Sequence, residues 1–116
     1  MMDNVHIHWQ QAVDLAGGDE ELLLHILELF LSESPIHRSN LQLAVDQLIL
    51  TDIMFHAHTL KGLLSTFGAN EASAAARHLE QLAKQGSNRS EIESQHQLFE
   101  NQLTELIPHL KQMLKY

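Results

Sequence analysis

The stretch that most constrains the fold is residues 53–69, which read IMFHAHTLKGLLSTFGA. Apolar side chains recur there at intervals of three or four, the spacing of one buried face of an α-helix. The members of this face are Ile53, Ala57, Leu60, Leu64 and Phe67. With about 100° of rotation per residue, His58 lies about 140° from Ile53. The stretch therefore predicts a helix that buries one side and presents a histidine on the other.

Gly62 lies one turn after His58 on the outer side of this helix. A glycine inside a helix costs about 1 kcal/mol relative to alanine, and no internal packing requires it on an exposed face. Because helical side chains tilt toward the N-terminus, a side chain at position 62 would crowd the space next to His58. We interpret Gly62 as a position where the absence of a side chain allows another molecule to approach the imidazole closely.

The same three-four periodicity recurs along most of the chain. It predicts a short helix from Trp9 to Ala16 that covers one end of the molecule with Trp9, Val13 and Leu15. Longer helices are predicted over residues 19–32, 35–49, about 51–67, 70–86 and from 90 nearly to the C-terminus. Short connections imply antiparallel neighbours. We therefore predict an all-α fold, an antiparallel up-down-up-down four-helix bundle with a short additional N-terminal helix.

Specific residues mark where these helices begin and end. Ser34-Pro35 should stop one helix and start the next, and Pro108 should kink or split the last one. Gly17-Gly18 should end the first helix, and Gly68 should end the His58 helix. The predicted N-terminal caps are Asp19, Thr51-Asp52, Asn70 and Ser90.

Composition bounds the class of protein. The 116 residues are expected to form a single domain, 1–116, with residues 1–8 flexible. The absence of cysteine excludes disulfides and fits a cytoplasmic chain. A net charge of −8 argues against nucleic-acid binding. We see no apolar run long enough to span a membrane and no signal peptide.

The residues around His58 carry a family resemblance. Ala57, the run His58-Thr59-Leu60-Lys61-Gly62 and the later Phe67-Gly68-Ala69 resemble the AHxLKG…GA signature of histidine phosphotransfer (HPt) domains. The resemblance extends more weakly from Trp9 to the final helix. Leu63 and Leu64 depart from the small residues that the family usually carries there, which changes packing and leaves the histidine in place.

This resemblance implies a role in phosphorelay signalling. His58 would accept a phosphoryl group from a receiver-domain aspartyl phosphate and pass it to another receiver aspartate. We see no nucleotide-binding loop, so the chain is expected to be a carrier and not an enzyme. No cofactor is expected on this domain, because the receiver would bring the Mg²⁺.

Further residues are candidates for supporting roles. Lys61 could reach the phosphoryl oxygens and offset their charge. Glu80 and Gln81 match the region that faces the histidine in the family, and either could orient the imidazole. The candidates for partner binding are Phe55, Met54, Ser65, Arg77 and Lys84. We expect Phe55 to be in the core or partly buried.

Two other readings stay open. The same bundle could dock receiver or kinase domains without being phosphorylated, or it could bind a metal or haem. The nine histidines invite the metal reading. However, His6 and His8, like His56 and His58, are two residues apart, a spacing that points side chains apart on a helix. We therefore predict no metal site.

The wider context is an expectation only. The abrupt start near the first helix favours the cytoplasmic C-terminal part of a membrane-bound hybrid sensor kinase over a free-standing protein. A monomer is the simple expectation for the oligomeric state.

Overall fold

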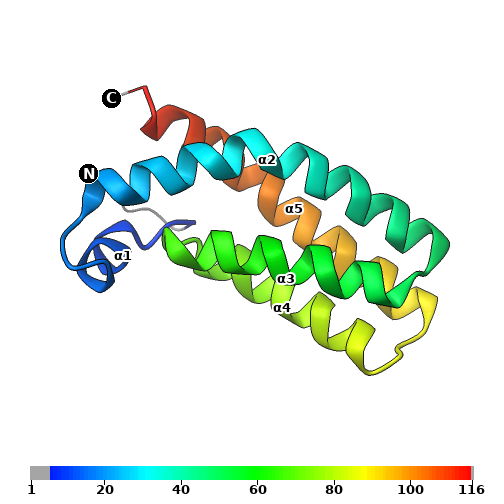
Figure 1. Ribbon diagram of the computed structural model, residues 1–116. Coiled ribbons are helices and arrows are strands. Elements are labelled where there is room, and N and C mark those ends of the chain that lie inside the picture. Colours follow the sequence, from blue (N-terminus) through cyan, green and yellow to red (C-terminus); the bar gives the residue numbers. More distant parts are fainter. Residues whose placement is uncertain (1–5, 116) are drawn as a thin grey trace.

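The computed structural model describes residues 6–115, which form five helices (Figure 1). These are α1 (Trp9–Leu15), α2 (Glu20–Gln47), α3 (Leu50–Thr66), α4 (Asn70–Lys84) and α5 (Arg89–Met113). Helix α3 packs between α2 and α4, and α5 closes the bundle against both α4 and α2. The predicted all-α bundle with a short N-terminal helix is confirmed.

The first long helix differs from the prediction at Pro35. Two helices were expected over 19–32 and 35–49, but α2 continues through Pro35 without a break. A proline inside a helix costs about 3 kcal/mol, whereas each fully buried large apolar side chain contributes about 1.5–3 kcal/mol. Burial outweighs the cost because residues on both sides of Pro35 share one core face: Leu23, Leu27, Phe30, Leu41, Ala44 and Val45. Pro108 likewise lies inside α5 and does not split it.

The helix ends agree with the prediction in part. The Asp19 side chain caps α2 by accepting a hydrogen bond from the Leu22 N–H at 3.0 Å, as predicted. The other predicted N-caps are wrong, because α3 and α4 begin without a side-chain cap and α5 is capped by Asn88. Gly86 ends α4 with a φ of +70°.

Helix α1 covers one end of the bundle. Trp9 and Val13 are buried there as predicted, but Leu15 is 84% exposed and does not contribute to the cover. Leu15 follows Val13 by two residues, about 200° round the helix, so it points away from the side that Trp9 and Val13 bury.

The segment before α1 is tied to the bundle at Gly68. Ile7 is fully buried, and the His8 N–H donates to the Gly68 carbonyl at 2.8 Å. Residues 6–8 therefore differ from the flexible terminus that the sequence suggested, while residues 1–5 lie outside the described residues.

One histidine is part of the core. His96 on α5 is 5% exposed, and its Nε2 has no hydrogen-bond partner among the described residues. Burial lowers the pKa of His96, although Glu100 and Asp46 act in the opposite direction. Burial therefore favours the neutral form of the imidazole.

Gly68 and Gly86 form a matched pair for testing how α1 is anchored. Both have positive φ, +89° and +70°, which strains any other residue. A Cβ at Gly68 would lie 2.6 Å from the His8 carbonyl oxygen, whereas a Cβ at Gly86 would meet nothing within 4 Å.

We expect Gly86→Ala to cost about 1 kcal/mol of unfolding free energy from backbone strain alone. Gly68→Ala should cost about 2–3 kcal/mol because the clash with His8 adds to the same strain. Urea unfolding measures both values. Equal losses in the two variants would show that the contact with His8 contributes nothing.

Candidate functional site

His58 lies on the outer side of α3, near the middle of the helix. Ile53, Ala57, Leu60 and Leu64 form the buried face, as their spacing predicts. The His58 side chain is 66% exposed. The imidazole is therefore open to a partner from solvent.

Glu80 on α4 joins His58 and Lys61 through a single carboxylate. The His58 Nδ1 lies 2.9 Å from Glu80 Oε2, and the Lys61 Nζ donates to Glu80 Oε1 at 2.9 Å. The two donors stand three residues apart on α3, so they lie on neighbouring turns and reach the same acceptor. Each carboxylate oxygen thus has its own partner.

The charge state of Glu80 fixes the proton on His58. Partial burial acts to raise the pKa of Glu80, but the hydrogen bonds from Lys61 and His58 outweigh it and hold this pKa below its usual range. Glu80 is therefore ionised at neutral pH and can only accept hydrogen bonds. In the neutral ring, the shared proton is then on Nδ1 of His58, so Nε2 carries the lone pair that can act as a nucleophile.

Close contact between α3 and α4 brings these groups together. Ala72 and Ala76 are buried on the face that α4 turns toward the core. The Ser73 hydroxyl on α4 donates to the backbone carbonyl of Lys61 on α3 at 3.0 Å, a further direct contact between the two helices. Small side chains on α4 therefore place Glu80 within reach of α3.

Gly62 is exposed, and a Cβ placed on it would meet nothing within 4 Å. Packing within residues 6–115 thus does not require glycine at this position. The Gly62 carbonyl accepts hydrogen bonds from the side chains of Ser65 and Thr66, at 3.1 and 2.8 Å. At position 62, one turn after His58, the surface is therefore bare backbone.

Comparison with known protein families shows to which family the chain belongs. A family model described as the Hpt domain matches residues 25–115, more than three quarters of the chain. The chain belongs to the Hpt domain family. Neither a curated protein nor a solved structure matches it significantly. Hpt domains carry phosphoryl groups in phosphorelays and interact with receiver domains, without kinase activity.

The two candidates for orienting the imidazole differ in this Hpt domain. Glu80 contacts His58, whereas its neighbour Gln81 is exposed on α4. The contact of Glu80 with Lys61 was not anticipated from the sequence. A helical wheel places residues within one helix, and it does not say which residues of the next helix stand at the same height.

The candidate partner-binding residues lie in three places. Phe55 is 61% exposed, so the expectation that it lies in the core or is partly buried was wrong. Met54 is half-buried. Ser65 and Arg77 line a groove of about 270 Å³ with Lys61, between α3 and α4. Lys84 is exposed in the last turn of α4.

A histidine pair lies on the side of α3 that faces α2, away from Glu80, and was missed by sequence reasoning. His37 on α2 and His56 on α3 are half-buried, and their Nδ1 atoms lie 3.1 Å apart. Burial and the proximity of His37 lower the pKa of His56, while Asp52 acts in the opposite direction. Two neutral rings can share one proton here, so the contact holds α2 and α3 together as a hydrogen bond.

The structure also bears on other kinds of site. Among residues 6–115, no three or more His, Asp or Glu side chains are grouped so that they could hold a metal ion. None of the helices in that range has the length and apolar character to cross a membrane.

The Glu80 contact predicts a specific tautomer for His58. Nitrogen-resolved NMR of the imidazole at neutral pH should show the Nδ1–H tautomer as the main form. Glu80→Ala should reduce its population because the acceptor is gone, while Gln81→Ala should leave it unchanged. A predominantly Nε2–H ring in the unaltered protein would contradict the assignment.

Proposed function

We propose that His58 accepts a phosphoryl group from a receiver aspartyl phosphate and passes it to the aspartate of another receiver. The observation that carries this proposal is the hydrogen bond of Nδ1 to Glu80 in a His58 side chain that is 66% exposed. The Nε2–P bond would form while the bond from phosphorus to the aspartate oxygen breaks on the opposite side. The aspartate carboxylate is the leaving group.

Glu80 has a clear part in this reaction. When Nε2 forms its bond to phosphorus, the ring becomes positively charged while Nδ1 keeps its proton. The Glu80 carboxylate, 2.9 Å away, stabilises that charge through the existing hydrogen bond. The reverse step restores the neutral ring, so neither direction requires a proton to leave the imidazole. Such a site suits a carrier that both receives and donates.

Lys61 is proposed to offset the negative charge of the phosphoryl group. Its Nζ is bound to Glu80 and its side chain is 25% exposed. Once the ring is positively charged and competes for Glu80, Lys61 can turn toward the phosphoryl oxygens and offset their charge. Arg77 and Lys84 add positive charge on α4, which helps a domain of net charge −8 approach an acidic receiver site.

The partner completes the site. We expect the receiver to bring Mg²⁺, which would neutralise charge on the phosphoryl oxygens during transfer. The exposed Phe55 ring and the half-buried Met54 provide an apolar contact one turn before His58. Ser65 lies further along the same helix, beside Gly62.

A non-phosphorylated interaction module is the second candidate. The exposed Phe55 is compatible with it, since a docking surface needs no reactive histidine. Gly62 and the Glu80 contact favour the phosphoryl carrier over this module. Docking alone requires neither an exposed backbone beside His58 nor a fixed tautomer of its ring.

The first test is transfer from a panel of phosphorylated receiver domains to the protein and to His58→Gln. The labelled phosphoryl group should appear on the unaltered protein only. Its bond to the protein should be labile in acid and stable in base, as expected for a phosphoramidate. Label on both proteins would move the site to another histidine. Label on neither, with receivers that bind, would favour the interaction module.

Gly62→Ala separates partner access from stability. A Cβ at position 62 meets nothing within 4 Å, and alanine favours helix over glycine. The free energy of unfolding of the variant should therefore rise by about 0.5–1 kcal/mol. Phosphotransfer should nevertheless slow by tenfold or more, about 1.4 kcal/mol of activation free energy, since the added methyl obstructs the receiver. Unaltered transfer in the stabilised variant would remove the proposed role of Gly62.

A further inference from the structure

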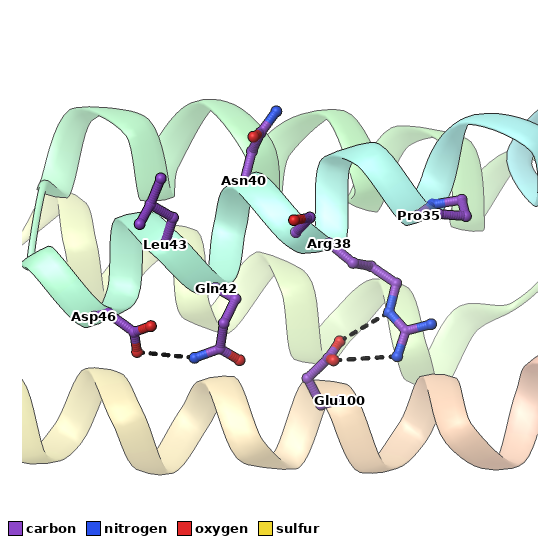
Figure 2. A pocket seen from close by; sticks show the side chains of 8 residues that line it. Pro35, Arg38, Asn40, Gln42, Leu43, Asp46 and Glu100 are labelled. Carbon is purple, nitrogen blue, oxygen red and sulfur yellow. Dashed lines mark hydrogen bonds and ion pairs between the residues drawn. The ribbon is translucent and has the colours of Figure 1, made fainter.

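Four large apolar side chains form an exposed stripe along α2, at intervals of seven residues. They are Leu22, Leu29, Ile36 and Leu43, which are 48%, 40%, 65% and 54% exposed. We call these four residues the α2 stripe. It lies on a different side of the helix from the buried residues, which include Leu23, Phe30 and Leu41. In Figure 2, Leu43 points away from α5, while Arg38 reaches Glu100 on that helix.

The seven-residue interval indicates what covers the stripe. Side chains that repeat every seven residues stay in line along the seam between two paired helices. A helix that packs only within its own bundle needs one apolar side, and α2 already has one. The residues three positions after Leu29 and Ile36 are Ser32 and Ser39, both exposed and small enough for a second helix to approach closely.

We propose that the α2 stripe pairs with the α2 stripe of a second copy of this chain, in antiparallel orientation. The stripe is symmetric about the point between Ser32 and Glu33. A two-fold axis there sets Leu22 against the partner's Leu43 and Leu29 against the partner's Ile36. The stripe is thus complementary to itself, as a two-fold interface requires.

Charge favours the antiparallel arrangement over the parallel one. The first half of α2, residues 20–33, carries four carboxylates and no Lys or Arg: Glu20, Glu21, Glu28 and Glu33. The second half carries one carboxylate, Asp46, and its Arg38 is paired with Glu100. A parallel pair would set the acidic halves against each other, whereas the antiparallel pair sets each acidic half against the less acidic one. The helix dipoles are also opposed in that arrangement.

The size of the seam indicates a weak dimer. At about 1.5 Å per residue, the stripe from Leu22 to Leu43 is about 32 Å long, which fits within the 41 Å length of the molecule. One helix pair covers less surface than the roughly 800 Å² per partner of a stable complex. The dimer should therefore form reversibly and depend on protein concentration. His58 lies on α3, so the dimer does not rest on the proposed phosphotransfer.

Analytical ultracentrifugation over protein concentrations up to millimolar tests the pairing. The unaltered protein should shift from monomer to dimer, and Ile36→Glu should weaken the dimer by at least tenfold. Leu98→Glu is the matched control, because Leu98 is 55% exposed on α5, outside the stripe. If Ile36→Glu fails to fold, Leu43→Glu repeats the test at the other predicted contact, where Leu43 meets the partner's Leu22. A monomer at every concentration, or equal effects of the stripe and control variants, overturns the proposal.

Cysteine cross-linking tests the orientation, since the chain has no native cysteine. In the antiparallel pair, two copies of Ser32→Cys meet near the two-fold axis and should form a disulfide between chains. Two copies of Ser39→Cys would stand about 20 Å apart along the seam, too far for a bond that requires Cα atoms within about 7 Å. Equal cross-linking of the two variants would overturn the antiparallel arrangement.

Discussion

The carboxylate of Glu80 accepts one hydrogen bond from His58 and one from Lys61, and the chemistry of the site depends on this pair of contacts. Ionised Glu80 fixes the tautomer of His58 and so determines which ring nitrogen faces a partner. In the proposed transfer, it also holds Lys61 until the phosphoryl group arrives. One acidic side chain on α4 therefore contacts both the proposed nucleophile and its neighbouring cation.

The bundle supplies the distances on which this arrangement depends. Buried alanines on α4 allow a close approach to α3, and the Ser73 hydroxyl bound to the Lys61 carbonyl keeps the two helices in register. On the opposite side of α3, the contact between His37 and His56 joins it to α2. The helix that carries His58 is thus held from both sides, while its outer surface stays open.

The sequence was most informative where a feature is periodic within one helix. The spacing of Ile53, Leu60 and Leu64 predicted the buried face of α3, and with it the outward position of His58. Features that depend on neighbouring helices were missed. The exposure of Phe55 and the continuity of α2 through Pro35 follow from how complete helices pack, which local residue preferences do not contain.

The buried imidazole of His96 makes the stability of the bundle depend on acidity. Its pKa is lower in the folded chain than the value of about 6.5 expected when unfolded, so the unfolded state binds the extra proton more readily. The contribution of neutral His96 to the free energy of unfolding is fully present at pH values above its pKa in the unfolded chain. This contribution declines as pH falls from there toward the lower pKa of the folded chain. Mild acid therefore weakens α5 from within the core, independently of any titration at the surface.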